Sequence, residues 1–329
     1  MKKTLIALAA VAVTTGAMAQ ATISGKFGYT YQANTSAAGV KSTGMAVSDG
    51  DVNFSASEDL GAGLKASVFM GIRLRGREAD ADGASDGIGA RDSTLTLSGG
   101  FGSLTVGSVA AGNGIASRGT AGAPGEGLDD NGEILDAEVN GVDLLQYTTP
   151  SFGGASVYVQ VIDSIGDPGA GGTETTSTVL SANAIGVNYS AGPISASVDT
   201  TSYSAHAAAV ATAANGQLED RVRLSASYDL GVAKVGFGMQ TKGYVLAENT
   251  QTVYGVSVPM GALTLGVAYG KNSTKIKATS VSTDNTGINW GANYALSKRT
   301  NVQLSYRVID TAASTTDTKS TRVRLMHSF

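Results

Sequence analysis

A period of two in apolar and polar residues constrains the fold of this chain more than any other feature. In VQLSYRV, the stretch 302–308, every second residue is apolar and the residues between are polar. The stretches 64–77, 221–228 and 233–242 alternate in the same way. This period is typical of β-strands whose two faces meet different surroundings, since side chains along a strand point alternately to its two sides.

The lengths of the links between these stretches separate a sandwich from a barrel. Some links are short, namely DLGAG, SGGFGS, TPSFGG, SAGP, DLGV, PMGA and ALSKRT. The segments between the resulting hairpins are long and polar, namely 33–45, 78–89, 163–181, 205–217, 272–284 and 311–319. Short periplasmic turns that alternate with long extracellular loops are the pattern of an outer-membrane barrel. The sequence therefore predicts an all-β transmembrane antiparallel barrel of about 16 strands, a size that leaves an aqueous channel.

The first 19 residues have the features of a secretory signal peptide. Two lysines precede an apolar stretch at 5–13, and small residues follow it, so we expect cleavage between Ala19 and Gln20. The apolar stretch is shorter than the roughly 20 residues that a membrane-spanning helix needs. We therefore expect a signal peptide at 1–19 and one barrel domain at 20–329, with no second domain.

Basic residues alternate with the apolar ones, although the whole chain has a formal net charge of −4. Without the signal peptide and its two lysines, 21 basic and 27 acidic residues give −6, which does not suggest a nucleic-acid partner. If the apolar face meets lipid, the basic face lines the lumen, because a buried cation costs about 2–4 kcal/mol at mid-bilayer. The expected basic wall consists of Lys26, Lys65, Arg73, Arg75, Arg77, Arg221, Arg223, Lys234, Lys242, Arg307, Arg322 and Arg324.

The longest segment without alternation, 109–141, holds a cluster of acids. They are Glu126, Asp129, Asp130, Glu133, Asp136 and Glu138. A loop of this length in a compact fold usually has a function. We expect it to fold into the barrel, where its carboxylates would face the basic wall and create a transverse field. On the residues alone, an outward loop exposed to solvent explains the pattern equally well.

Blocks along nearly the whole chain resemble the general trimeric porins of Gram-negative bacteria, of the β-proteobacterial type. They include SASEDLGAGLKASVF, LSGGFGSLTVGS, QYTTPSFGGASVYV, YDLGVAKVGFGMQ, VSVPMGALTLGVAYG, YALSKRTNVQLSYRV and the final RLMHSF. The resemblance implies a 16-stranded barrel that forms a homotrimer, with the third extracellular loop folded into the pore. It also implies that Phe329 is read by the barrel-assembly machinery. The remaining expected partners are outer-membrane lipid, lipopolysaccharide, ions and small hydrophilic solutes.

The chain departs from the family pattern at three positions where an arginine is common. They hold Asp51, Ser108 and Gln146. These departures leave the preference for anions or cations open. The leading hypothesis is passive diffusion of ions and small hydrophilic solutes, and the alternative is a substrate-selective channel for an anionic metabolite. A third class is an adhesin or structural protein whose loops carry the function.

Other chemistries find little support in the sequence. His206 and His327 are the two histidines, and neither belongs to a recognisable catalytic triad. The segment 128–138 only superficially resembles a calcium loop, because its acids do not follow the required register. We therefore expect no catalytic residue, no metal site and no cofactor.

Overall fold

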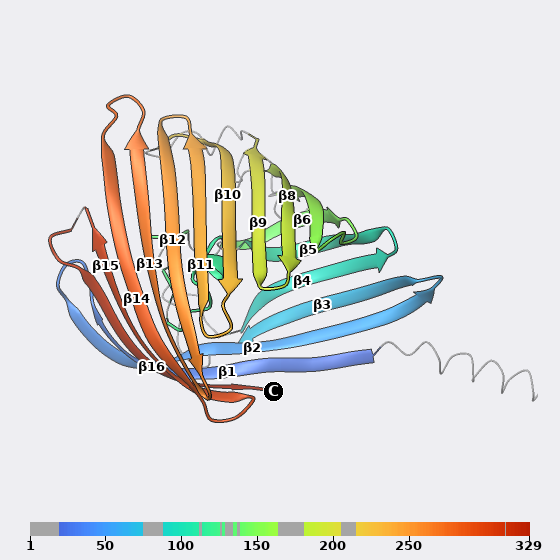
Figure 1. Cartoon of the computed structure of the whole chain (residues 1–329), viewed down its shortest axis with the longest axis horizontal. Helices are drawn as coiled ribbons and strands as arrows, with labels where there is room; N and C mark the ends of the chain where they lie inside the picture. Colours follow the sequence, from blue (N-terminus) through green and yellow to red (C-terminus); the bar gives the residue numbers. More distant parts are fainter. Residues whose placement is uncertain are drawn as a thin grey trace, which may run out of the picture.

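A computed structural model of the chain shows a wall of strands that closes on itself (Figure 1). It describes residues 20–74, 88–111, 114–125, 127–128, 134–136, 139–163, 181–204, 215–312 and 314–329. The first eight strands are β1 (Gln20–Thr35), β2 (Lys41–Gly61), β3 (Leu64–Leu74), β4 (Ile88–Gly99), β5 (Gly102–Ala111), β6 (Val139–Thr148), β7 (Ala155–Asp163) and β8 (Ala182–Ala191). The others are β9 (Ile194–Tyr203), β10 (Leu218–Asp229), β11 (Lys234–Tyr244), β12 (Ala247–Met260), β13 (Leu263–Ile276), β14 (Ser282–Ala295), β15 (Thr300–Thr311) and β16 (Thr318–Ser328). A short helix, α2 (Ala116–Gly119), follows β5.

The strands form a closed antiparallel barrel in chain order. Each strand pairs with the next, and β1 pairs with β16 over ten residue pairs, from Lys26↔Ser328 to Thr35↔Lys319. Beyond this ladder, the backbone amides of Gly25 and Phe329 each donate to the other's carbonyl over 3.0 Å. The predicted all-β barrel of 16 strands is confirmed.

The predicted short turns are present, but two of the predicted long loops are wrong. β1 and β2 pair up to Thr35↔Lys41, which leaves a link of only 36–40. β13 and β14 pair up to Lys275↔Ser282, which leaves only 277–281. These segments are polar on both faces, so the alternation vanishes from the sequence although the backbone hydrogen bonds continue.

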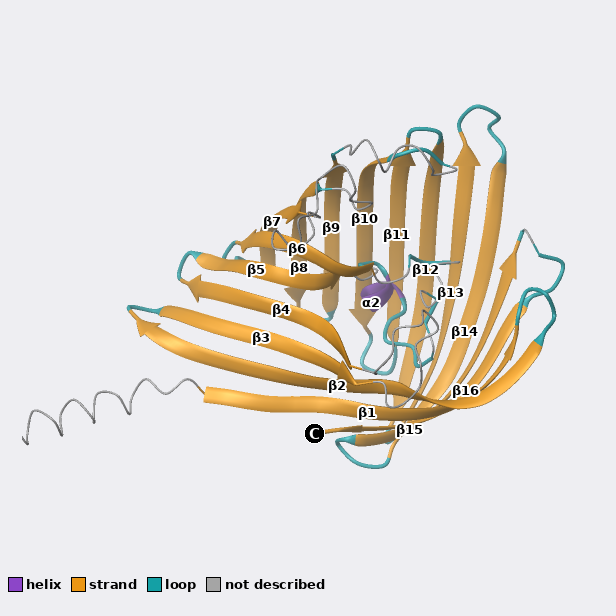
Figure 2. Cartoon of the chain, turned by 180° about the vertical axis from the view of Figure 1, so that it is seen from behind, coloured by secondary structure: helices purple, strands orange, loops and turns teal. Residues whose placement is uncertain are grey.

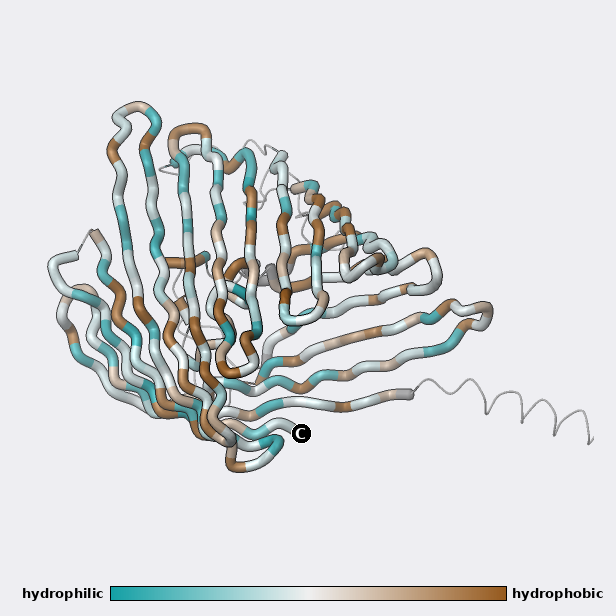
Figure 3. The backbone as a smooth tube through the Cα atoms, viewed as in Figure 1, coloured by the Kyte–Doolittle hydropathy of each residue, from teal (hydrophilic) through white to brown (hydrophobic). Residues whose placement is uncertain are grey.

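The two faces of the wall differ as the alternation predicts. On β16, Val323 and Leu325 are 44% and 52% exposed on the outer face. Arg322 and Arg324, between and beside them, donate to groups inside the barrel. In Figure 3, hydrophobic and hydrophilic residues follow one another along the strands.

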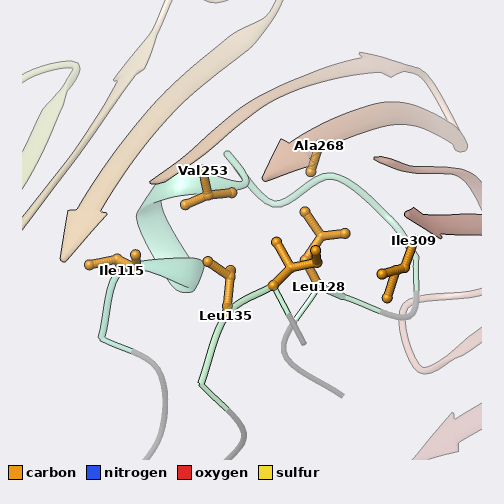
Figure 4. Packing of buried hydrophobic residues seen from close by; sticks show 7 residues of the cluster. Ile115, Leu128, Leu135, Val253, Ala268 and Ile309 are labelled. Atoms are coloured by element: carbon orange, nitrogen blue, oxygen red, sulfur yellow. The ribbon is translucent and has the colours of Figure 1, made fainter. Parts of the chain in front are cut away.

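The buried apolar core lies inside the barrel. Ile115, Leu128, Ile134 and Leu135, all from the link between β5 and β6, are at most 1% exposed. They pack against one another and against apolar residues of the inner wall (Figure 4), namely Val253, Ala268 and Ile309. The core therefore fastens a loop to the wall, because the barrel itself has its apolar residues outside. No helix among the described residues is long and apolar enough to cross a bilayer.

Candidate functional site

The link between β5 and β6 enters the barrel, as expected for the segment 109–141. β5 continues to Ala111 and β6 begins at Val139, so the loop proper spans 112–138. Figure 2 shows α2 in the interior, and α2 contacts β10, β11 and β12. The helix ends within one turn, where Thr120 donates from both its amide and its hydroxyl to the carbonyl of Ala116, over 3.0 and 2.9 Å.

Glycines on the inner wall form the surface on which this loop rests. A Cβ atom at Gly236 would lie 2.1 Å from the carbonyl oxygen of Arg118, and one at Gly255 2.2 Å from the backbone of Thr120. At Gly291, it would lie 2.5 Å from the carbonyl oxygen of Pro124. No side chain fits at these positions, so glycine is what lets the loop backbone lie flat against the strands.

Asp136 fastens the end of the loop to β11 and β12. Its Oδ1 lies 2.6 Å from Nζ of Lys242 and accepts a hydrogen bond from Gln251 over 2.8 Å. Its Oδ2 accepts from Gln240 over 2.7 Å. Burial alone would raise the pKa of Asp136, but Lys242 and these amide donors outweigh it, so the pKa falls below its ordinary value of 3.8.

The wall also satisfies carbonyl groups of the loop. Arg307 and Arg322 donate to the carbonyls of Gly127 and Gly125 over 3.3 and 3.4 Å. Ser257 donates to the carbonyl of Ala121 over 2.7 Å. Together with Lys242, three of the expected wall cations therefore bind the loop.

A charged cluster lies on the inner face of β16, β1, β2, β3 and β4, next to the strands that carry the loop. We call it the Asp49–Asp51 cluster, and its members are Asp49, Asp51, Lys26, Arg73, Arg91 and Arg324. The carboxylate of Asp51 lies 3.4 Å from Lys26, 3.7 Å from Arg73 and 3.2 Å from Arg91. Asp49 lies 2.7 Å from Lys26 and 3.0 Å from Arg324. Among the described residues, the cluster holds four cations and two carboxylates, two positive charges more than negative ones.

A second basic group stands on β10. Nε of Arg223 donates to both carboxylate oxygens of Asp199, over 2.9 and 3.0 Å. Arg221 donates to Thr201 over 3.2 Å, and its guanidinium lies 5.8 Å from the ring centroid of Tyr203. Within the described part of the chain, Arg221 forms no ion pair, and its buried Nε has no hydrogen-bond partner.

The described members of the expected basic wall all follow the inner phase of their strands. They are Lys26, Lys65, Arg73, Arg221, Arg223, Lys234, Lys242, Arg307, Arg322 and Arg324. Lys65 and Lys234 lie beside the short turns, apart from the two charged groups. The remaining expected residues lie outside the described part, namely Arg75, Arg77, Glu126, Asp129, Asp130, Glu133, Glu138 and Ala19. Gln20 begins β1.

The expected set of acids, all of them in the segment 109–141, is incomplete. Asp49, Asp51 and Asp199 belong to the wall itself and bind cations that the sequence left unpaired. Arg91 was missed as well. In a regular strand it would lie on the same outer face as Leu95, which is four residues further along the chain. Irregular pairing of β3 with β4 near Met70 and of β1 with β2 near Gly28 shifts the phase of these strands. Bulges of this kind re-aim side chains, and nothing in the local alternation marks them.

The inner surface shows no metal-binding cluster in the ranges that the structure describes. No group of three histidine, aspartate or glutamate side chains gathers there. Asp49 and Asp199 of the wall and Asp136 of the loop pair with lysine or arginine.

Comparison with known proteins places this architecture in a family. The sequence profile of the Gram-negative porins matches residues 5–314. The outer membrane porin protein 32 of Delftia acidovorans is 31% identical over 298 residues, which are 80% of this chain and 77% of that protein. The anion-selective porin from Comamonas acidovorans superposes with a TM-score of 0.69 at 24% identity, over 95% of this chain and all of that one. The trimer form of OmpT from Vibrio cholerae gives a TM-score of 0.63 at 11% identity, over 94% of this chain and 99% of that one. With its sixteen-stranded barrel and inward loop, the chain belongs to the family of Gram-negative porins of the outer membrane.

Proposed function

We propose that this outer-membrane diffusion channel passes ions and small hydrophilic solutes between the inward loop and the Asp49–Asp51 cluster, with a weak preference for anions. The observation that carries the proposal is the position of the loop. Its described residues lie on the inner face of β9 to β16, and the Asp49–Asp51 cluster begins on β16 and continues along β1 to β4. Solutes cross by exchanging water for fixed charges, and no bond is made or broken, so the chain acts as a channel and not as an enzyme.

The preference follows from the balance of charge in the cluster. Its two carboxylates offset only part of its four cations. Fixed charges that line a constriction raise the local concentration of the opposite ion. The wall carboxylates, among them Asp51 at a position where arginine is common in the family, keep this field small, so we expect the preference for anions to be weak.

Reconstitution in planar bilayers tests the proposal. We expect stepwise conductance in KCl, and in a salt gradient a zero-current potential on the anion-selective side. The potential should shrink in about 1 M salt, where the Debye length falls to about 3 Å. Heat-unfolded protein is the control. An absence of steps from correctly folded protein contradicts the channel, and a cation-selective potential contradicts the stated preference.

A substrate-selective channel for an anionic metabolite is the second candidate, and Arg221 favours it. This arginine has no carboxylate partner among the described residues, and arginine binds carboxylate and phosphate with two parallel hydrogen bonds. A saturable block of the chloride current by citrate or phosphate, lost in Arg221→Gln but kept in Arg223→Gln, would select this candidate. A current that stays proportional to salt at every citrate concentration rules it out.

The assembly of the channel is proposed on related grounds. We propose a homotrimer, since the OmpT neighbour is described in a trimer form. Export would use the signal peptide at 1–19, and insertion would use the barrel-assembly machinery, with Phe329 as its signal. Contacts with outer-membrane lipid and lipopolysaccharide follow from the exposed apolar residues of the outer face. Crosslinking of the protein extracted in mild detergent should give a ladder that ends at three chains.

A further inference from the structure

Phe69 is an aromatic residue on the water-facing side of the wall. Its neighbours Val68 and Met70 are 37% and 51% exposed on the outer face, whereas Phe69 shares the inner phase of β3 with Lys65 and Arg73. The other phenylalanines lie outside the lumen. Phe27, Phe54 and Phe237 follow the outer phase, Phe101 and Phe152 lie in turns, and Phe329 closes the barrel. Phe69 is less exposed than its outward neighbours Val68 and Met70, and the uncovered part of its side chain faces the lumen.

The ring borders a cavity on the inner wall whose other side chains are mainly hydroxyls. The cavity has a volume of about 390 Å³ and is lined by Phe69 with Thr22, Ser55, Ser57, Ser67, Thr94, Thr96, Ala56 and Val68. Ser55 and Thr94 lie directly across the strands from Phe69, one on each side. Thr96 bonds to Thr105 over 2.9 Å. The hydroxyls of Ser55, Ser67 and Thr94 form no hydrogen bond with any described residue, so they are free for a solute.

The nearest charges along the strand lie at a distance from the ring. Lys65 and Arg73 are each four residues from Phe69 on β3, which corresponds to about 13 Å at the rise of a strand. Arg91 turns its guanidinium toward Asp51, whose register partner is Arg73 and not Phe69. The lining of the cavity holds no charged side chain, although Lys65 is two residues from its lining residue Ser67 on the same face of β3.

We propose that this cavity, the Phe69 subsite, binds pyranose rings of neutral sugars on their way through the channel. The proposal rests on the channel function argued above. A pyranose has an apolar face of axial C–H groups, which stacks on the negative face of an aromatic ring. Its equatorial hydroxyls point outward around the rim, where free serine and threonine hydroxyls can both donate and accept. A site for simple ions requires charge and no aromatic ring, so the class of ligand follows from this combination.

Binding is measured first, without any current, by saturation-transfer NMR on the folded protein in detergent. The probe is D-glucose, and sorbitol is its control because it carries the same kind of hydroxyls, one more than glucopyranose, on a chain without a rigid apolar face. We expect transfer to the glucose C–H protons and little to sorbitol. Equal transfer to both overturns the role of the ring.

Variants then place the site. Phe69→Leu keeps an apolar side chain of similar size but removes the aromatic face, and it should weaken glucose binding by roughly threefold to tenfold, the usual range for one aromatic contact. Thr94→Val removes one rim hydroxyl with no change of shape and should weaken binding less. Phe54→Ala, on the outer face, is the control. If Phe69→Leu binds glucose as the unchanged protein does, the proposal is wrong.

Current recordings separate failure of this inference from failure of the proposed function. If the protein shows conductance steps in KCl, but glucose changes neither the current noise nor the NMR spectrum, the channel function is supported and the Phe69 subsite is rejected. If no conductance steps appear in KCl, the channel function is rejected, and the NMR result still tests the Phe69 subsite. In a working channel, glucose should add current noise, and the glucose concentration that gives half of this noise should rise roughly threefold to tenfold in Phe69→Leu and stay unchanged in Phe54→Ala.

Discussion

Asp51 shows how one wall carboxylate moderates its surroundings. It lies within 3.7 Å of three cations, and its side chain is 10% exposed. Burial of three like charges without a counterion would be unfavourable, so the acid allows Lys26, Arg73 and Arg91 to lie together. The same carboxylate reduces the positive field that they create in the lumen.

Replacement of Asp51 by asparagine should therefore make the channel more selective for anions. The excess charge of its cluster rises from two to three, while the volume of the side chain stays the same. We expect the zero-current potential in a salt gradient to move further toward the chloride potential, with a loss of about 1 kcal/mol in folding stability from the repulsion.

The matched control for this experiment is Asp284→Asn. Asp284 pairs with Lys271 over 2.7 Å, but both side chains are more than 40% exposed and follow the outer phase of their strands. Its removal should leave the zero-current potential unchanged. A shift of the same size in both variants would mean that Asp51 acts through net charge alone.

At the scale of elements, the loop and the strands beneath it behave as one unit. Four apolar side chains, a row of glycines and the Asp136 contacts all fasten the same segment to the same wall. Such a loop moves only if several contacts break together, because packed interiors resist small displacements.

Gly255→Ala should displace the loop. The added methyl would lie 2.2 Å from the backbone of Thr120, which has no flexible end to move aside. Overpacking of this kind costs typically about 1–3 kcal/mol. We expect a lower unfolding temperature and a larger, more variable single-channel conductance. Gly44→Ala is the control, since a methyl there meets nothing within 4 Å. If both variants have the same unfolding temperature and conductance, the close contact between Gly255 and the loop does not hold the loop in place.

The ion pair at Asp136 should make the fastening of the loop sensitive to acid. The folded pKa lies below the ordinary value of 3.8, so the stabilisation is complete above that value and is lost as pH falls through the folded pKa. Asp136→Asn should lower stability by roughly 1–3 kcal/mol at pH 7, because charge-assisted hydrogen bonds to Lys242 and two glutamines are weakened.

The test compares the unfolding temperatures of the two proteins between pH 7 and pH 3. The difference in unfolding temperature should stay constant down to about pH 4 and become smaller below it. Protonation of Asp136 then removes the charge from the unchanged protein, as the substitution to asparagine already has. A difference that stays the same at pH 3 would show that the charge of Asp136 is not what holds the loop.

At the scale of the whole molecule, closure depends on the pairing of the first and last strands. Gly25 and Phe329 exchange backbone hydrogen bonds at one end of this seam. A Cβ atom at Gly25 would lie 2.6 Å from the ring of Phe329, so the ring covers the glycine. The last residue thus contributes to closure in addition to its proposed role in assembly.

Phe329→Ala should slow barrel formation and lower the temperature at which the folded barrel converts to the unfolded mobility on SDS gels. Because the ring of Phe329 is about half exposed, its removal should lower the free energy of unfolding by about 1–2 kcal/mol. Phe152→Ala is the control, because that ring lies in a turn and is 90% exposed. If purified protein refolds into detergent at the same rate with and without Phe329, its role is confined to recognition in the cell.

Much of the architecture follows from local pattern. Alternation along stretches such as 302–308 predicts strands with one apolar and one polar face, and the short Gly-containing links predict hairpins. Both signals are local because the pleat of a strand fixes which way each side chain points. The basic phase of β10 and β16 could be identified in this way, whereas the lengths of the loops at 33–45 and 272–284 could not, since polar strands resemble loops in sequence.

The sequence by itself therefore determined the barrel, its approximate number of strands and the inner position of its basic residues. Only the tertiary structure decided which charges meet. Asp51 joins Lys26, Arg73 and Arg91 from four different strands, and the irregular pairing of β3 with β4 turns Arg91 inward. The glycine surface under the loop, which includes Gly236, Gly255 and Gly291, also forms only when the strands of the barrel pair. Local pattern sets the direction of a side chain, but register and closure set its neighbours, and these depend on residues far apart in the chain.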